Sequence, residues 1–446
     1  CGARNCAPVS VARGESEVIT MRILFLSHYF PPEVNAPASR TYEHCKQWVQ
    51  DGHEVTVVTC APNHPRGIVY EGHRNTLFQR EKRDGIQIVR VWTYVTANEG
   101  FLKRTLNYLS YMIAAVLVAP FLSRCDVVIS TSPQFFNGLA GYLVSRLKRA
   151  PWILEIRDLW PESIVAVGAI TYRPVIRLLE RLESFAYRKA THLVVVTDAF
   201  KAHMLARGIP SKKVTVIKNG VDFSLYKEPP HGSLGLLREL GLEGKFVVSY
   251  FGTHGMAHCL QTVLEAAQEL QDRKDIVFLL VGDGAERSRL VSMRDEMKLS
   301  NVVMLDQQPK EKMPELWSLS NVSLVLLKKS TLFKTVLPSK IFESMAMEKP
   351  VILGVEGESA ELVMSAGGGI CIQPEDGKDL AGQVLKLYRD RTLCHKLGAS
   401  GRRYVLEHFD RQVLARRFAD VMLLVYKSAS GAGYPCRTPS SLRAED

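Results

Sequence analysis

The sequence lacks the cysteine spacing of a disulfide-rich or metal-binding protein. Its nine cysteines are odd in number and scattered, and no two of them are separated by two residues. Several, such as Cys60 and Cys371, lie within apolar runs. Thiols in such surroundings are typical of a protein kept in a reducing compartment, so we expect buried free cysteines and no metal site.

A hydrophobic run long enough to cross a membrane is also missing. Residues 106–122 carry no charge, but a spanning helix needs about 20 apolar residues and this run falls short. Lys103, Arg104 and Arg124 flank the run. Two interpretations stay open, namely a helix lying on a membrane surface and a buried helix connecting two strands. Residues 164–181 show a second pattern of apolar residues beside arginines.

Acidic residues are fewer than basic ones. The chain has 57 Lys and Arg against 46 Asp and Glu, for a net charge of +11. This balance favours a negatively charged partner. Zinc-finger, helix-turn-helix and aromatic RNA-binding signatures are absent, so we expect no nucleic-acid partner. Anionic lipid and the phosphates of a nucleotide sugar are the remaining partners.

Short apolar strands alternate with helical patterns, which is typical of parallel sheets built from βαβ units. A chain of 446 residues is too long for one ordinary core, so two or three domains are expected. The alternation pauses at residues 219–243, which are richer in Gly, Pro and charge, and then resumes. The sequence therefore predicts an α/β protein with two doubly wound, Rossmann-like halves. The expected strands are 22–27, 54–59, 86–92, 126–130, 152–156, 192–196 and 213–217 in the first half, and 246–251, 276–281, 301–305, 322–326 and 350–353 in the second.

These patterns divide the chain into five parts. Residues 1–20 lack the apolar core of a signal peptide and are expected to be a disordered extension. The two halves are expected at 21–225 and 226–405. Residues 406–428 should form a helix that crosses back to the first half, and residues 429–446 should be a disordered tail.

Residues 337–353 predict a loop, a short helix and a buried strand. Pro338 sets a dihedral angle that starts a helix, and Ser339 suits its first turn. Unpaired N–H groups at a helix start favour a phosphate, and Lys340 adds a full positive charge. Glu343 lies one turn further on the same face, where a carboxylate can accept hydrogen bonds from a ribose. A capped helix with a solvated Lys and Glu is the alternative interpretation.

Four motifs in order along the chain carry a family resemblance. They are residues 27–40, 155–163, 218–222 and 338–343. With them, residues 21 to about 425 resemble the retaining family-4 glycosyltransferases of the GT-B fold. The likeness is greatest to bacterial enzymes that add an amino sugar such as N-acetyl-fucosamine during O-antigen or colanic-acid assembly.

The resemblance implies an N-terminal acceptor domain and a C-terminal nucleotide-sugar domain facing a central cleft. It implies catalytic roles for Arg157, Asp158 and Lys340, and acceptor contacts by His28 and Arg40. The residues expected to bind the donor are Asn35, Ala36, Gly252, Thr253, His254, Gly255, His258, Gly282, Gly284, Pro338, Ser339, Lys340 and Glu343.

The sequence departs from the family pattern at several positions. Thr335 stands where the first of two family glutamates would hold the donor sugar. Thr253 and His258 replace an arginine and a lysine that neutralise the diphosphate. Arg157 aligns with a family histidine, and it cannot act as a base because its pKa exceeds about 12. We expect it to hold a phosphate or an acceptor group instead.

The resulting hypothesis is retaining transfer of an N-acetylamino sugar from a UDP-sugar to a lipid-linked saccharide, in cell-surface polysaccharide synthesis. No cofactor and no Mg²⁺ are expected to be required. The enzyme should be cytoplasmic and peripheral to the inner face of the plasma membrane. The alternatives are a UDP-sugar 2-epimerase, a catalytically weakened membrane-associated nucleotide-sugar-binding protein, and a dinucleotide oxidoreductase suggested by the Gly282-x-Gly284 pattern.

Overall fold

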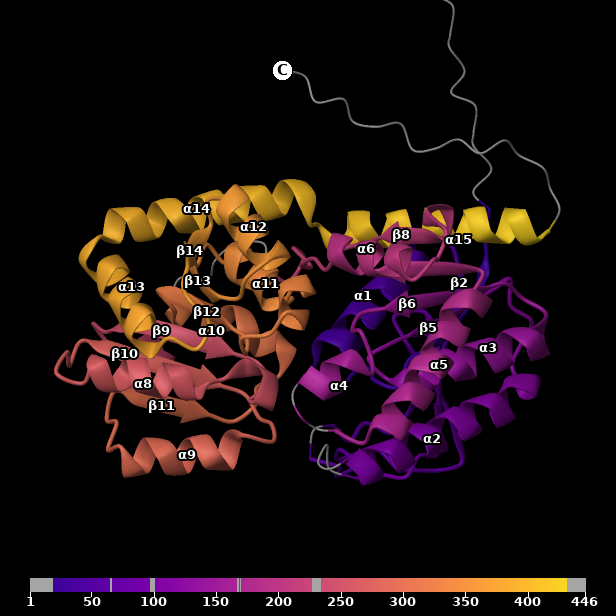
Figure 1. The fold of residues 1–446 in the computed structure, drawn as a ribbon, viewed down its shortest axis with the longest axis horizontal. Helices are drawn as coiled ribbons and strands as arrows, with labels where there is room; N and C mark the ends of the chain where they lie inside the picture. The colour runs from indigo at the N-terminus through magenta and orange to yellow at the C-terminus, as the bar shows by residue number, and fades with distance from the viewer. Residues whose placement is uncertain are drawn as a thin grey trace, which may run out of the picture.

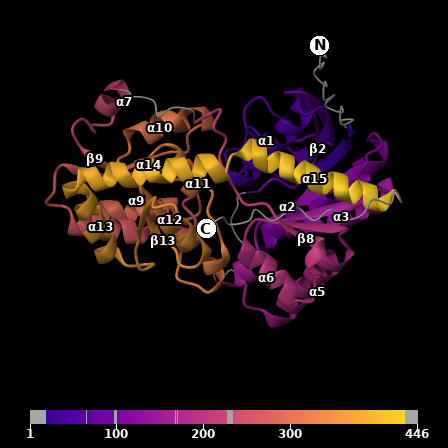
Figure 2. The same cartoon turned by 90° about the horizontal axis from the view of Figure 1, so that it is seen from above.

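The computed structural model describes residues 19–64, 66–96, 101–166, 168, 170–226 and 234–430. These residues form two halves side by side, each a sheet covered by helices (Figures 1 and 2). Most of the expected N-terminal extension and of the C-terminal tail lies outside the described residues, as does part of the expected linker. The two doubly wound halves predicted from the sequence are confirmed.

The N-terminal half is built on an eight-stranded sheet in the order β3-β4-β2-β1-β5-β6-β7-β8. Its central strands are parallel and almost wholly buried, which explains their continuous apolar runs. The edge strand β3 is antiparallel, and its polar sequence gave no sign of a strand. The strands are β1 (Arg22–Leu26), β2 (Glu54–Cys60), β3 (Phe78–Arg83), β4 (Ile86–Val91), β5 (Val127–Thr131), β6 (Trp152–Ile156), β7 (His192–Val195) and β8 (Val214–Val216).

Helices cover both faces of this sheet (Figure 1). Within α2, Tyr111 and Ala115 are buried in the core, whereas Ile113 and Leu117 are exposed. The uncharged run therefore forms a connecting helix with one exposed apolar face, and contact of that face with a membrane stays a prediction. The helices are α1 (Ala36–Gln50), α2 (Phe101–Val118), η1 (Ala119–Phe121), α3 (Phe135–Lys148), α4 (Glu162–Ala166), α5 (Arg173–Lys189), α6 (Asp198–Ala206) and η2 (Ser211–Lys213).

The C-terminal half has a six-stranded, fully parallel sheet in the order β11-β10-β9-β12-β13-β14. The order reverses between β9 and β12, and ligands bind at the carboxyl ends of the strands at such a point. The three-residue strand β14 was too short to be recognised in the sequence. The strands are β9 (Phe246–Phe251), β10 (Ile276–Val281), β11 (Val302–Leu305), β12 (Val322–Leu326), β13 (Val351–Gly354) and β14 (Gly369–Cys371).

Most of the helices in this half pack on the two faces of its sheet, with two apolar clusters between them. They are α7 (Leu234–Glu239), η3 (Met256–His258), α8 (Gln261–Glu269), α9 (Arg287–Glu296), η4 (Lys310–Lys312), α10 (Met313–Leu319), η5 (Leu332–Thr335), α11 (Lys340–Ala346), α12 (Glu358–Ser365), α13 (Gly377–Arg389) and α14 (Arg391–His408).

The last described helix, α15 (Arg411–Ala429), belongs to the N-terminal half (Figure 2). It packs on α1, where the Trp48 indole donates a 2.8 Å hydrogen bond to the Ala415 carbonyl and contacts Phe418. The boundary expected between residues 405 and 406 falls inside α14 and is therefore placed too early. The chain changes halves where Val221 bridges Asp410, just before α15.

Candidate functional site

A cavity of about 470 Å³ lies between the two halves. Loops at the carboxyl ends of strands from both sheets surround it, including Arg157 after β6 and Gly252 after β9. The position agrees with the rule that parallel sheets bind ligands at this edge. The cavity is the candidate site.

Two glycine loops form part of its C-terminal wall. A Cβ atom on Gly282 would lie 1.8 Å from the Gly252 carbonyl oxygen, and the Gly282 φ of +153° also favours glycine. A Cβ atom on Gly284 would lie 2.6 Å from the His254 carbonyl oxygen. The two loops can therefore touch only because side chains are absent there. This contact explains the Gly282-x-Gly284 pattern as close loop packing.

Lys340 is the first residue of α11 and lines the cavity. Its ammonium nitrogen is buried, has no hydrogen-bond partner among the described residues, and lies 3.7 Å from the centroid of the Tyr250 ring. Burial lowers its pKa to about 7. Helix α11 has only seven residues and Ser339 makes no side-chain capping bond, so Lys340 rather than the helix dipole supplies most of the attraction for an anion.

Two histidines lie beside this lysine. Both ring nitrogens of His254 and the Nδ1 of His258 are buried without a hydrogen-bond partner. Burial lowers their pKa values to about 4 and about 3, and the charge of Lys340 contributes to both shifts. Thr253 and His258 line the cavity, whereas His254, Gly255 and Gly284 are not among its lining residues. Donor contacts by these three residues therefore stay a prediction.

Glu343 faces the cavity one helical turn after Lys340. Its carboxylate makes no hydrogen bond to another described residue, and burial raises its pKa. The nearby Tyr226 also lines the cavity, and its hydroxyl has no hydrogen-bond partner within residues 19–226 and 234–430 as far as the structure describes them. Pro338 and Ser339 complete this side. A free carboxylate beside a free hydroxyl is suited to bind vicinal hydroxyl groups of a ligand.

The N-terminal wall begins at the start of α1. The Asn35 side-chain oxygen accepts a 2.9 Å hydrogen bond from the Ala38 N–H, while its amide nitrogen is buried and unpartnered. Ala36 is the first residue of this fifteen-residue helix. Both residues line the cavity, so the helix start and a spare amide donor face the ligand space.

Arg157 and Asp158 line the same wall after β6. The Ser132 hydroxyl accepts hydrogen bonds from both of their backbone N–H groups, at 2.7 and 3.3 Å. The Nε and Nη1 of Arg157 are buried without partners, and burial lowers its pKa to about 9. Burial raises the pKa of Asp158. Arg157 is thus a second unsatisfied cation at the cavity.

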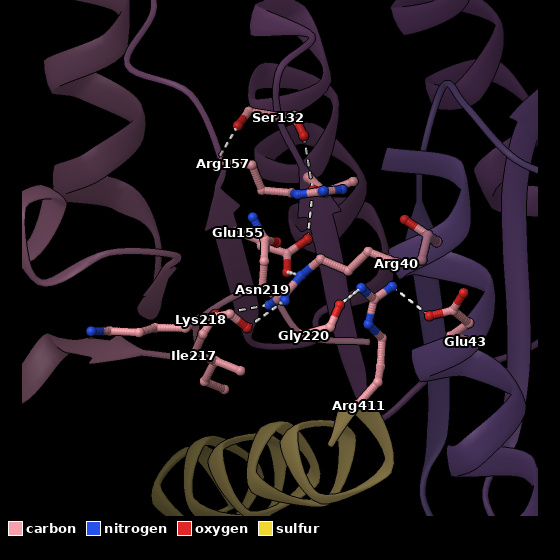
Figure 3. Close-up of polar contacts among 12 residues, drawn as sticks. Arg40, Glu43, Ser132, Glu155, Arg157, Ile217, Lys218, Asn219, Gly220 and Arg411 are labelled. Carbon is pink, nitrogen blue, oxygen red and sulfur yellow. Dashed lines mark hydrogen bonds and ion pairs between the residues drawn. The ribbon is translucent and has the colours of Figure 1, made fainter. Parts of the chain in front are cut away.

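The structure corrects the expectation that Arg40 contacts an acceptor. Its side chain is 1% exposed and does not line the cavity. Its guanidinium pairs with Glu155 at 2.9 Å and donates to the carbonyl oxygens of Ile217 and Lys218, at 3.0 and 2.8 Å (Figure 3). Every guanidinium nitrogen therefore already has a protein acceptor. Two of these acceptors lie in residues 217–220, the hinge that leads from β8 toward the C-terminal half.

His28 is corrected in the same way. It is 4% exposed, does not line the cavity, and its ring packs edge-on against Tyr29, Tyr108 and Tyr111. Burial lowers its pKa to about 3. The ring therefore supports the loop after β1 instead of contacting an acceptor.

Several cavity residues were missed in the sequence. The loop after β11 contributes Gln307, Gln308 and Lys310, and the hinge contributes Asn219, whose amide donates to the Leu337 carbonyl at 3.1 Å. The strand-end rule could have found the β11 loop, because the strand itself was predicted. Thr335, at the family glutamate position, is not among the lining residues, and its hydroxyl donates a hydrogen bond to the Leu332 carbonyl at 2.6 Å.

Direct bonds between the halves border the cavity. Arg66 pairs with Asp283 at 2.8 Å, and Lys310 pairs with Glu43. Glu358 of α12 accepts hydrogen bonds from the first N–H groups of α6, at 3.2 and 3.0 Å. These contacts hold the two walls of the cavity at their observed separation.

Two protein-family models match the chain, one in each half. Residues 35–220 match a glycosyl transferase 4-like domain, and residues 238–404 match the glycosyl transferases group 1. Among the described residues, no helix is long and apolar enough to cross a membrane.

Known proteins resemble between 58% and 91% of the chain. A putative colanic acid biosynthesis glycosyl transferase of Escherichia coli is 24% identical over 408 residues, covering 89% of this chain and 98% of that protein. A probable glycosyltransferase, WbjE, of Pseudomonas aeruginosa is 26% identical over 58% of this chain and 65% of its own length. Anabaena HepE, solved in complex with UDP-glucose, has a TM-score of 0.68 at 18% identity, covering 91% of this chain and 100% of HepE. The lipopolysaccharide glycosyltransferase WaaG has a TM-score of 0.65 at 14% identity, covering 90% of this chain and 99% of WaaG.

Proposed function

This chain belongs to the GT4 family of glycosyltransferases and has the GT-B fold, and we propose that it transfers a sugar from a UDP-sugar to a lipid-linked saccharide with retention of configuration. The relatives named for colanic acid and lipopolysaccharide synthesis support a role in bacterial polysaccharide assembly. The sugar that we propose is transferred is an N-acetylamino sugar such as N-acetyl-fucosamine. The HepE complex with UDP-glucose supports the choice of UDP.

One observation carries this proposal, namely the unpaired Lys340 ammonium in the cavity. A buried cation without a partner costs several kcal/mol, and such a group is retained where a ligand supplies the missing charge. A diphosphate fits this requirement. We place it between Lys340, the Gly252 loop and the start of α1, with the ribose at Glu343.

The proposed chemistry is a same-face displacement. The bond from the anomeric carbon to the diphosphate oxygen breaks, a bond to the acceptor hydroxyl oxygen forms, and the acceptor proton passes to the departing diphosphate. Lys340 stabilises the negative charge that develops on the diphosphate. Arg157, whose pKa of about 9 keeps it protonated at neutral pH, holds a phosphate or the acceptor beside Asp158. No step requires a metal ion, so independence from Mg²⁺ stays a prediction.

A ligand screen tests the proposal. UDP-, GDP- and dTDP-sugars are titrated against the full chain by calorimetry, and bound donors are then assayed for turnover with a lipid-diphosphate saccharide. Binding of a UDP-sugar followed by acceptor-dependent release of UDP supports transfer. Release or isomerisation of the sugar with donor alone supports a 2-epimerase instead. Binding without any turnover supports the weakened, membrane-associated alternative, which the departures at Thr253 and Thr335 suggest.

Glu343→Ala sharpens the donor assignment. Loss of two charged hydrogen bonds of about 1.5 kcal/mol each predicts a weakening of donor binding on the order of 100-fold. The exposed Glu361 of α12 offers a matched control, and Glu361→Ala should leave the dissociation constant unchanged. An unchanged donor dissociation constant in Glu343→Ala would show that the ribose does not bind at Glu343.

We also propose that the enzyme works at the inner face of the plasma membrane as a peripheral protein. The net charge of +11 and the exposed apolar face of α2 support this position.

A further inference from the structure

The edge of the N-terminal sheet has a face that α2 covers only in part. Helix α2 packs over Val89 and Val91 of β4, which lie in one apolar cluster with Tyr111 of the helix. In the antiparallel pair that β4 forms with the edge strand β3, Phe78 lies opposite Val91. Arg80 lies opposite Val89 in the same way. Because side chains opposite each other on paired strands share a face of the sheet, Phe78 and Arg80 lie on the face that α2 packs on, and both are exposed.

An apolar groove of about 740 Å³ lies along this edge. It is bounded by α2 and η1 on one side and by β3 and the end of β4 on the other. Its most exposed side chains are Leu77, Leu117 and Phe121, which are 83%, 67% and 77% exposed. Apolar side chains this exposed, gathered in one groove, mark an interaction surface.

The charges at the groove are positive. Among the described residues that line it, Arg80 is the one cation and none is acidic. The Arg80 guanidinium lies 5.2 Å from the centroid of the Phe78 ring, and it forms no ion pair within the part of the chain that the structure describes. Lys82, two residues further along β3, lies on the same face and is exposed. Glu81 lies on the other face, where it pairs with Arg90 at 2.8 Å.

This combination favours a lipid over the chain's own terminal segments. Residues 1–18 contain no leucine, isoleucine, methionine or aromatic residue, and residues 431–446 contain one tyrosine and one leucine. Neither segment therefore has the apolar side chains to fill the groove. An anionic phospholipid offers both an apolar chain and a charge that attracts Lys and Arg.

A second copy of the chain fits less well. Two copies paired on this groove about a two-fold axis would place the same basic surface against itself, without an acidic lining residue to compensate. Trp92, which lines the groove and is 39% exposed, also favours a bilayer, because tryptophan is enriched where lipid meets water.

We propose that this groove binds a phospholipid with an anionic headgroup at the bilayer surface, with the phosphate at Arg80 and Lys82 and an acyl chain along Leu117 and Phe121. The inference rests on the peripheral membrane position included in the proposed function, and it names the surface and the lipid class that hold the enzyme there. Among the described residues, the groove and the interdomain cavity share no lining residue. Lipid binding and donor binding can therefore be separated by mutation.

Vesicles of phosphatidylcholine, with and without phosphatidylglycerol, test the proposal on the full chain. Cosedimentation measures binding, and phospholipids brominated on their acyl chains quench a tryptophan that contacts those chains. The chain has five tryptophans, of which Trp92 is 39% exposed and the other four are at most 7% exposed. Quenching should therefore come from Trp92, and Trp92→Phe should remove most of it.

Two variants with matched controls give the expected pattern. Arg80→Gln should weaken binding to phosphatidylglycerol vesicles about fivefold and leave binding to pure phosphatidylcholine unchanged. Arg389→Gln, at an exposed arginine of α13, should change neither. Leu117→Gln should weaken binding to both kinds of vesicle about tenfold and reduce the quenching of Trp92. Leu406→Gln, at an exposed leucine of α14, should have no effect.

Several outcomes would overturn the lipid site. They are absence of vesicle binding, equal affinity for the two kinds of vesicle, and binding that is insensitive to Arg80→Gln and Leu117→Gln or leaves Trp92 unquenched. Analytical ultracentrifugation examines the other occupant. A dimer that Leu117→Gln dissociates while vesicle binding stays intact would show that the groove holds a second copy.

UDP binding, measured by calorimetry on every variant, distinguishes this inference from the proposed function. The groove variants should bind UDP as the unmodified protein does. Normal UDP binding with any of the contrary vesicle results would overturn the lipid site and leave the donor site standing. Absence of UDP binding in the unmodified protein, together with the expected vesicle results, would overturn the proposed sugar transfer and leave the lipid site standing.

Discussion

Two buried cations, Arg40 in the N-terminal half and Lys340 in the C-terminal half, illustrate opposite uses of charge. Every guanidinium nitrogen of Arg40 donates a hydrogen bond to a protein acceptor, namely Glu155 or one of two carbonyl oxygens. Lys340 has a buried ammonium that forms no hydrogen bond within the part of the chain that the structure describes, and it lies 3.7 Å from the centroid of the Tyr250 ring. Burial alone therefore does not mark a functional residue. A buried charge marks a ligand site when the protein itself leaves it unsatisfied.

The surroundings of each cation explain the difference. Arg40 lies where α1, β6 and the segment at Ile217 and Lys218 meet. Beside it, the Arg411 side chain from the start of α15 pairs with Glu43 and donates a hydrogen bond to the Gly220 carbonyl (Figure 3). That network ties α15 to α1 and to the chain at Gly220. Lys340 lies at the open carboxyl edge of the C-terminal sheet, where loops leave space instead of packing.

Breaking the Arg40 network should give the largest effect. Arg40→Met leaves Glu155 buried without its cation and should destabilise the N-terminal half by about 3–5 kcal/mol. Chemical denaturation followed by tryptophan fluorescence measures the loss. The double variant Arg40→Met/Glu155→Leu removes both charges and should recover much of the stability. A loss below about 1 kcal/mol in the single variant would show that the pair is not structural.

Removing the Lys340 charge should act in the opposite sense on stability. Lys340→Met keeps the volume but removes an uncompensated buried charge, so the free energy of unfolding should rise by about 1–2 kcal/mol. Sugar transfer should fall on the order of 100-fold, about 2.7 kcal/mol of transition-state stabilisation. Lys328→Met, at an exposed lysine in the same half, is the control. Equal turnover in Lys340→Met would count against its catalytic role.

The pH dependence of donor binding should give the smallest effect. The pKa of Lys340 is about 7 in the free protein, and a bound diphosphate raises it. Below pH 7 the charge is already present, so UDP-sugar affinity should be highest there. Above pH 7 binding must take up a proton, and affinity should fall by up to about tenfold per pH unit. His254 and His258, with pKa values of about 4 and 3, stay neutral throughout this range in the free protein.

Calorimetry from pH 6 to 9 in buffers of different ionisation enthalpy measures both the affinity and the proton uptake. The dependence should vanish in Lys340→Met. A slope that persists in that variant would assign the proton to another group, and Glu343, whose pKa is raised by burial, would be examined next.

The central strands could be read from the sequence because parallel strands buried on both faces need continuous apolar runs. The observed β9, β10 and β12 have the bounds that were expected. The edge strand β3 could not be predicted, because Phe78–Arg83 has no apolar face that would pack on the core. Its extended conformation depends instead on its antiparallel pairing with β4. Lys340 and Glu343 were predicted because their residue types fit an anion and a ribose at a loop-to-helix turn, and both line the cavity.

Arg40 and His28 show the limit of the same reasoning. A polar residue near a strand end can line a cavity, or it can be buried and bonded to its neighbours. The sequence does not distinguish these two outcomes. The sequence by itself determined two Rossmann-like halves, their order, and the turn that carries Lys340, since these depend on local pattern and spacing. Only the tertiary structure decided which charges are paired, because ion pairs such as Arg40–Glu155 join residues far apart in the chain. It likewise decided that α2 borders an exposed apolar groove, because the groove depends on how the helix and the sheet edge pack together.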